Sequence, residues 1–259
     1  AYDGKIVERN AAGEEVRPLD ISITKNVLGL FINSAVLLVI MMSCVRWYKK
    51  HPLEDGAPKG GVGMIEATVL SIYNDVIKGC IGENYRRYAP YLLTAFFFVL
   101  VNNLMGLIPI FPGGANVTGN IAITLVLALC TFVLTNVYGT KAYWKEIFWP
   151  DVPTWLKAPI PMMPLIEFFG IFTKPFALMI RLFANIMAGH AAVLSLVAII
   201  FITVKSGPVI NGSMTVVSVA FSIFMNALEI LVAFIQAYVF TMLSAVFIGL
   251  SQVKEHAEK

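Results

Sequence analysis

Charged residues are scarce in this sequence. Only 14% of its 259 residues are Asp, Glu, Lys or Arg, whereas about 25% is usual for soluble globular domains. Hydrophobic residues make up 58%, and the mean hydropathy is +0.77. This balance excludes an ordinary soluble domain and indicates a membrane protein. The formal net charge of +3 is small, and no nucleic-acid partner is expected.

Motifs for phosphate, redox and metal chemistry are also missing. The chain has neither a G-x-x-x-x-G-K-[ST] loop nor a G-x-G-x-x-G turn, so nucleotide chemistry belongs to a partner and no enzyme activity is expected of this chain alone. Cys44, Cys80 and Cys130 lie too far apart for a metal or redox motif, so we expect them to pack. No cofactor and no metal are expected. Because the sequence begins with Ala1, a removed leader is one expectation and an artificial start is the other.

The sequence does contain apolar runs long enough for helices that cross ~30 Å of hydrocarbon. A barrel is excluded because its strands would alternate in polarity. The runs predict an all-α integral membrane protein with five crossing helices. These spans cover about residues 27–48, 89–110, 121–138, 164–204 and 215–252. Residues 1–26 and 253–259 are expected to be extramembrane tails.

Residues 62–82 follow the pattern of an amphipathic helix. One helical face carries only apolar side chains, those of Ile65, Val69, Ile72, Tyr73, Val76 and Cys80. Ser71, Asn74, Asp75 and Lys78 share another face, so we expect this helix to lie along the membrane interface.

Basic residues indicate the orientation of the chain. Arg46, Lys49 and Lys50 end the first span, and positive charge favours the cytoplasmic side. The N-terminus is therefore expected outside and the C-terminus in the cytoplasm.

The two final apolar runs are unusually long. At ~1.5 Å per residue, residues 164–204 would form a helix of roughly 60 Å, about twice the hydrocarbon thickness. Fitting it would need a tilt of about 60°, beyond the ~0 to 40° usually seen. Even if Pro175 broke this helix, the remainder would tilt steeply. We expect two long antiparallel helices that lie obliquely in the membrane.

Few ionisable residues lie within these two runs. They are Glu167, Lys174, Arg181, His190 and Glu229. Such a side chain at membrane depth costs at least ~2.5 to 3.5 kcal/mol, so each is a functional candidate. At about 100° per residue, Glu167, Lys174 and Arg181 share one helical face, whereas His190 lies about 180° from Arg181. The arginine is a fixed positive charge rather than a proton carrier.

The arginine face also carries small side chains, those of Ala177, Ala184, Ala188, Ala192 and Ser195, together with Asn185. Small residues let another helix pass close by. We therefore expect a partner helix against this face.

An antiparallel fold about residues 207–212 brings His190 to the depth of Glu229 and Arg181 to the depth of Gln236. A histidine and a glutamate in a wet crevice can exchange protons near neutral pH, and a structural ion pair is the alternative. For Gln236, orienting Arg181 and merely linking two helices are both open.

Other polar residues allow simpler explanations. Glu167 fits either a proton exit on the inner side or a preference for negative charge near a helix start. Lys174 is expected to extend to the inner membrane surface. The side chains of Asn102, Asn103, Asn120 and Asn136 could bond across helices or line water, and helix packing is the favoured role.

Five motifs together resemble one known family. They are RLFANIMAGH at residues 181–190, PLIEFFG and TKPFAL before it, LEILVAFIQAYVFTML in the last run, and NLMGLIP in the second. This combination resembles subunit a, the stator channel subunit of the membrane sector of F-type ATP synthases, over about residues 27–252.

The resemblance implies a role for each matching position. Arg181 would face the ring of rotor subunits, with Asn185 one turn further and Gln236 near it. His190 and Glu229 would line the outer half-channel, and Glu167 would lie near the inner one. The chain departs from some members at Gly106, where they carry an acidic residue.

The implied function is that of a proton-translocating stator subunit. Two offset half-channels would serve carboxylates of the rotor c-ring, with Arg181 preventing a proton short circuit. The implied partners are the c-ring, the peripheral-stalk subunit b, the other ATP synthase subunits and the lipid bilayer. A bacterial inner membrane is the expected location, and an organelle inner membrane is the alternative.

Two other functions fit a helical bundle with buried ionisable residues. An ion-coupled secondary transporter would usually show an internal repeat with broken helices, and none is evident in the sequence. A structural scaffold of a respiratory complex would not depend on Arg181.

Overall fold

The computed structural model of the chain describes residues 8–9, 15–16, 24–51, 58, 60–108, 117–148 and 162–252, and nearly all of these are helical. The longer helices are α1 (Lys25–Lys50), α2 (Gly61–Ser71), α4 (Tyr85–Leu107), α5 (Ile121–Val137), α6 (Lys141–Phe148), α8 (Met162–Thr203) and α9 (Pro208–Ser251). Short helical segments are η3 (Ile72–Lys78), α3 (Gly79–Ile81), η4 (Gly82–Asn84) and η5 (Val204–Ser206). Two two-residue strands, β1 (Glu8–Arg9) and β2 (Glu15–Val16), pair antiparallel. The predicted all-α fold class is confirmed.

The predicted tails fall almost entirely outside the described residues. Of residues 1–26 only the two strands and residues 24–26 are described, and residues 253–259 are not. The tail boundaries therefore stay predictions.

Four helical stretches among the described residues are long and apolar enough to cross a membrane. They are Lys25–Lys50, Gly61–Leu107, Pro164–Ser206 and Pro208–Ser251. The pair α5 and α6, bent by 97° at the break between them, would make a fifth span if counted as one. The predicted number of five crossings is the upper end of this range, and their tilt stays a prediction.

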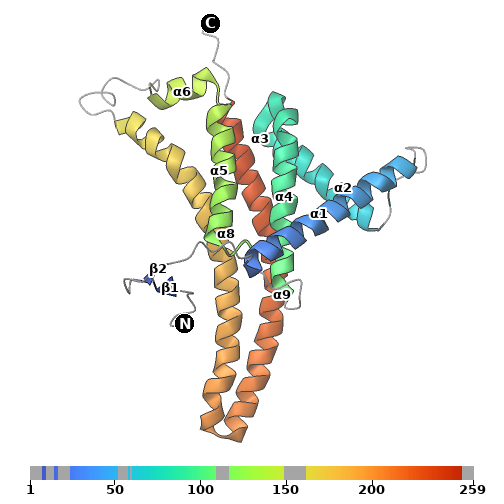
Figure 1. Cartoon of the computed structure of the whole chain (residues 1–259), viewed down its shortest axis with the longest axis vertical. Helices are drawn as coiled ribbons and strands as arrows, with labels where there is room; N and C mark the ends of the chain where they lie inside the picture. Colours follow the sequence, from blue (N-terminus) through green and yellow to red (C-terminus); the bar gives the residue numbers. More distant parts are fainter. Residues whose placement is uncertain are drawn as a thin grey trace.

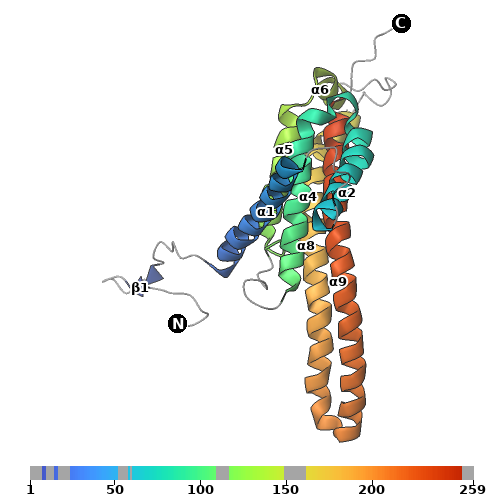
Figure 2. The ribbon, with the colours of Figure 1, turned by 90° about the vertical axis from the view of Figure 1, so that its right-hand side faces the viewer.

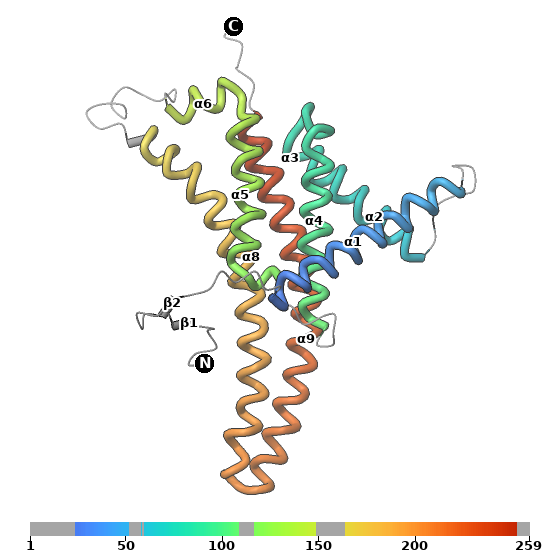
Figure 3. The backbone as a smooth tube through the Cα atoms, in the orientation of Figure 1, coloured from blue at the N-terminus to red at the C-terminus, as the bar shows by residue number. Residues whose placement is uncertain are grey.

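Helices α8 and α9 form a long antiparallel hairpin (Figures 1 and 2). One half of the hairpin lies beside α4 and α5, and the other half projects beyond the remaining helices. Gly207, with φ of 102°, and Pro208 at the first turn begin α9 earlier than the predicted residue 215, since Pro favours that position. Helix α8 continues through Pro175, and Figure 3 shows it changing direction along its length.

The apolar core lies where α4, α8, α9 and the η3–α3 segment meet. Leu92, Phe96 and Val99 of α4 pack there with Leu182 of α8 and Phe240 of α9, and each is no more than 2% exposed. Burial of Leu182 fixes the rotation of α8. The neighbouring residue, Arg181, consequently lies on the exposed side of that helix.

The predicted amphipathic segment packs on protein. Ile72 and Val76 are 2% exposed and belong to the core, whereas Asn74 and Asp75 are exposed. The predicted division into apolar and polar faces is thus observed. Its apolar side contacts α4 and α9, while a position along the membrane interface stays a prediction.

Polar side chains connect α1, α4 and the segment before α5. Asn33 Nδ2 donates a hydrogen bond of 2.9 Å to Asn102 Oδ1. Thr118 Oγ1 donates one of 2.7 Å to Asn103 Oδ1. These contacts match the predicted role of Asn102 and Asn103 in helix packing.

Candidate functional site

A cavity of about 280 Å³ opens between α4, α8 and α9. Most of its wall is apolar, formed by residues such as Leu107, Ile186, Met225, Leu228 and Val232. A few polar side chains project into it, those of Asn103, Asn185, His190, Glu229 and Gln236. A mostly apolar cavity with a few convergent polar groups is the usual form of a functional site.

The first polar pair is His190 and Glu229. Nδ1 of His190 lies 3.5 Å from Oε1 of Glu229, and their side chains are 34% and 11% exposed. The predicted antiparallel pairing of these two residues is therefore observed. Because His190 is the more exposed of the two, water that reaches it also comes close to the largely buried carboxylate of Glu229, which is an arrangement suited to proton exchange.

Gly189 makes room for this pair, a role that was not predicted from the sequence. A Cβ atom at this position would collide with the carboxylate and Cγ of Glu229. Glycine in a helix interior costs about 1 kcal/mol relative to alanine. A glycine placed next to His190 despite this cost was therefore the sequence signal that another side chain comes close to the helix there.

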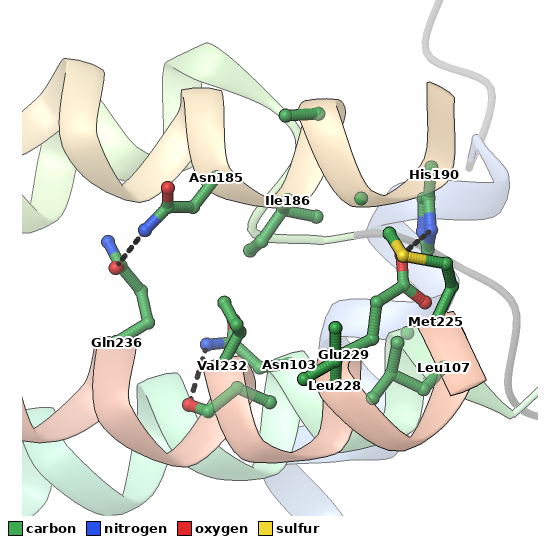
Figure 4. A pocket seen from close by; sticks show the side chains of 14 residues that line it. Asn103, Leu107, Asn185, Ile186, His190, Met225, Leu228, Glu229, Val232 and Gln236 are labelled. Atoms are coloured by element: carbon green, nitrogen blue, oxygen red, sulfur yellow. Dashed lines mark hydrogen bonds and ion pairs between the residues drawn. The ribbon is translucent and has the colours of Figure 1, made fainter. Parts of the chain in front are cut away.

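The second polar pair is Asn185 and Gln236. Asn185 Nδ2 donates a hydrogen bond of 2.6 Å to Gln236 Oε1, and Gln236 is 3% exposed. Figure 4 shows the two pairs at opposite ends of the cavity, with Ile186 and Val232 between them. Sequence reasoning placed Gln236 at the depth of Arg181, whereas its observed partner is Asn185, one turn further along α8.

Arg181 lies outside the cavity. Its side chain is exposed, and within the described parts of the chain it forms no hydrogen bond or ion pair. Ala177, Ala184 and Ala188 of the same helix are exposed as well. This surface presents one cation among small side chains, as the sequence pattern predicted.

Glu167 and Lys174 lie away from His190 and Glu229, toward the start of α8. Both are half-buried. Glu167 is close enough to Tyr143 of α6 to interact with it electrostatically, and Lys174 lines a separate small cavity between α5, α6 and α8. The structure thus separates Glu167 from the polar pairs of the larger cavity.

Asn103 also belongs to the larger cavity, which is the less favoured of the two roles predicted for it. Its Nδ2 donates a hydrogen bond of 3.3 Å to the carbonyl of Ala233 on α9. Gly106, one turn further along α4, lines the cavity without adding a side chain. In the described ranges, no three His, Cys, Asp or Glu side chains gather as metal ligands.

These features define a helical membrane protein with a mostly apolar cavity between α4 and its two longest helices, a few polar side chains that line this cavity, and an exposed arginine outside it. A family model described as the ATP synthase A chain matches residues 28–249. The chain belongs to this family, and the resemblance seen in the sequence motifs is confirmed.

Similar proteins from bacteria support the same family membership. The chain is 47% identical to ATP synthase subunit a of a strain of Chlorobium phaeobacteroides, over 99% of this chain and 75% of the relative. It is 45% identical to ATP synthase subunit a of Chloroherpeton thalassium, over 93% of this chain and 70% of the relative. For ATP synthase subunit a of Myxococcus xanthus the identity is 39%, over 92% and 75% of the two chains. These bacterial relatives, with the membrane-length helices, support the bacterial plasma membrane as the location.

Proposed function

We propose that this chain is the proton-translocating stator subunit of an ATP synthase. It offers two offset half-channels to carboxylates on a ring of rotor subunits, and it couples proton flow to rotation of that ring. ATP is made by partner subunits, and this chain has no catalytic activity of its own. Its membership of the ATP synthase A chain family supports the proposal. The peripheral-stalk subunit b, the other synthase subunits and the lipid bilayer complete the set of partners.

One observation supports the proposal most: His190 and Glu229 pair with each other, whereas Arg181 has no partner among the described residues. His190 and Glu229 lie 3.5 Å apart in a cavity, where they can pass protons between water and a site beside α8. Arg181 is exposed on the adjoining surface, with no partner in the part of the chain that the structure describes. An unpaired guanidinium at membrane depth is costly, so a carboxylate from another subunit is its expected partner.

The fixed charge of Arg181 would separate the two half-channels. At about 4 Å, two unit charges interact with about 4 kcal/mol in an effective dielectric of 20. A membrane potential of 100 mV supplies only about 2.3 kcal/mol per charge. Arg181 therefore stabilises the ionised form of a ring carboxyl group that comes near it, so that a protonated site releases its proton before it passes, and it repels a proton that would pass directly between the half-channels.

Glu167 would lie on the exit side. It is half-buried near the start of α8 and apart from the larger cavity, which supports two separate routes to the surface. We place the N-terminus outside and the C-terminus in the cytoplasm, because Lys49 and Lys50 at the end of α1 favour the cytoplasmic side. The exit near Glu167 is then cytoplasmic.

Charge removal at Arg181 tests the proposal. In energised vesicles, Arg181→Ala should abolish proton-driven ATP synthesis while the complex still co-purifies with its ring. Lys205→Ala is the matched control, because Lys205 is an exposed cation at the hairpin turn, and its synthesis rate should be unchanged. Retained synthesis in the Arg181 variant would refute the proposed mechanism.

An ion-coupled secondary transporter is the alternative function. Its transport would depend on the cavity residues His190 and Glu229 but would need neither a rotor ring nor ATP. Ion uptake by the purified chain alone in lipid vesicles would favour this alternative.

A further inference from the structure

A second, much smaller cavity lies between α5, α6 and α8, next to the proline inside α8. Its volume is about 10 Å³, and Thr135, Asn136, Ile171, Lys174 and Pro175 are among the residues that line it. A single water molecule needs roughly 10 to 15 Å³ and two to four polar partners. The cavity is therefore of the size for one water, and the polar groups on its wall decide whether it holds one.

The amide oxygen of Asn136 is the first of these groups. Asn136 Nδ2 donates a hydrogen bond of 2.8 Å to the carbonyl of Phe132 in its own helix. Asn136 Oδ1 is inaccessible to solvent and accepts no hydrogen bond from any residue that the structure describes. A buried acceptor without a donor destabilises the fold, so this oxygen favours any donor that can reach it.

The backbone of α8 supplies a second acceptor. Pro175 lies inside this helix and has no N–H, so the carbonyl of Ile171 lacks its normal helical donor. Ile171 and Pro175 both line the small cavity. Two residues from different helices, each of which carries an acceptor without its usual donor, thus line the same space.

Lys174 supplies donors. Its side chain is half-buried, and no hydrogen bond or ion pair joins it to any other described residue. A lysine ammonium carries three donors and no acceptor. It therefore cannot be satisfied by apolar neighbours, and it complements the two acceptors on the wall of the cavity.

We propose that this cavity is a binding site for one water molecule that links Lys174 to α5. The water accepts a hydrogen bond from Lys174 Nζ and donates its two hydrogens to Asn136 Oδ1 and the Ile171 carbonyl. All three groups gain a partner. The ammonium is then held toward α5 inside the protein, in contrast to the sequence-based expectation that Lys174 extends to the membrane surface.

The site would join α5 to α8 at the proline, two helical turns before Arg181. This inference goes beyond the proposed function, because the water site concerns packing within the chain and holds whichever ion the complex moves.

A double-mutant cycle tests the link in the intact complex. Lys174→Met and Asn136→Leu, alone and combined, would be compared by the temperature at which half of the complex dissociates. Each single change should lower this temperature, and the double variant should be lowered no further than the more sensitive single variant. Additive shifts would overturn the proposal.

The control cycle replaces Asn136→Leu with Asn226→Leu. Asn226 is exposed on α9 and, like Asn136, donates a hydrogen bond of 2.8 Å to a carbonyl of its own helix. Its combination with Lys174→Met should be additive. A non-additive control would mean that Lys174→Met disturbs the whole fold, and the proposal would fail.

A high-resolution electron cryomicroscopy map of the complete synthase provides an independent readout. Density for a water within hydrogen-bond distance of Lys174 Nζ and Asn136 Oδ1 is expected. A lysine turned to the membrane surface, or a water that contacts no ammonium, would overturn the inference. Neither measurement depends on proton transport, so failure here and failure of the proposed function are distinguishable.

Discussion

His190 Nδ1 on α8 and Glu229 Oε1 on α9 lie 3.5 Å apart at one end of the larger cavity. The pair joins the two helices of the hairpin at a point where the wall is otherwise mostly apolar. Its acid and base come from different helices, so the pair exists only when the hairpin is in this register. This dependence makes its chemistry testable by exchange of the two residues.

Exchange of the two side chains should preserve the pair. His190→Glu and Glu229→His should each reduce proton-driven ATP synthesis strongly, because like groups then face each other. The double variant should recover several-fold over either single variant, since residues in contact are coupled by about 0.5 to 3 kcal/mol. Synthesis rates per assembled complex in vesicles provide the measurement. A double variant no better than the singles would argue that the residues act independently.

Gly189→Ala should disrupt the same pair without removing either partner. The added methyl group would collide with the carboxylate of Glu229, and this flexible side chain must then turn away from His190. We therefore expect reduced ATP synthesis with little net change in heat resistance, because alanine also favours the helix by up to about 1 kcal/mol. Gly212→Ala is the control, because a Cβ there has open space, and a gain of up to roughly 1 kcal/mol is expected in a helix. Heat resistance and synthesis rate would be measured for both. Equal behaviour of the two variants contradicts the close approach of Gly189 to Glu229.

Gly249→Ala should weaken the contact between α9 and α3. A Cβ at Gly249 would collide with the carbonyl of Cys80, and backbone cannot move aside as a flexible side chain can. A loss of about 1 to 3 kcal/mol is expected, visible as earlier dissociation of the complex on heating. Gly79→Ala, in the same contact region but with free space around its Cβ, should be close to neutral. An unchanged dissociation temperature for Gly249→Ala would rule out the close backbone contact.

Asn33→Leu should loosen α1 from α4. Asn33 is 2% exposed and donates to Asn102 Oδ1, so its loss leaves that buried oxygen without this donor. Hydrogen bonds between membrane helices contribute about 0.6 kcal/mol on average, up to about 1.7. A double-mutant cycle with Asn102→Leu, read by heat resistance of the complex, should return coupling in this range. Ser43→Ala is the control, because Ser43 bonds only within α1 among the described residues.

The motifs that resemble the ATP synthase family are readable in the amino-acid sequence itself, and so are the long final helices. The pairing of His190 with Glu229 was also predictable. Register along an antiparallel hairpin follows from the position of its turn and the fixed rise of ~1.5 Å per residue. Both quantities are local properties of the chain.

Other features could not be predicted in this way. The partner of Gln236 is Asn185, one turn from the residue that depth alone suggested, because lateral pairing depends on how two helices are rotated against each other. The apolar face of residues 62–82 suggested a membrane surface, yet it packs on α4 and α9. Periodicity shows that a face is apolar but not whether lipid or protein covers it.

The sequence by itself determined the all-α class, the two long final helices and the register that brings His190 opposite Glu229, since these follow from hydrophobicity and helical rise. The tertiary structure alone decided which side chains share a cavity. It brought Asn103 of α4 into the same cavity as Asn185 and Gln236, left Arg181 exposed, and placed Lys174 at a small cavity that residues of α5 also line. These outcomes depend on how the helices are rotated, and on the close approach of the Glu229 side chain to Gly189 and of the Cys80 carbonyl to Gly249. Packing among segments far apart in the chain sets both.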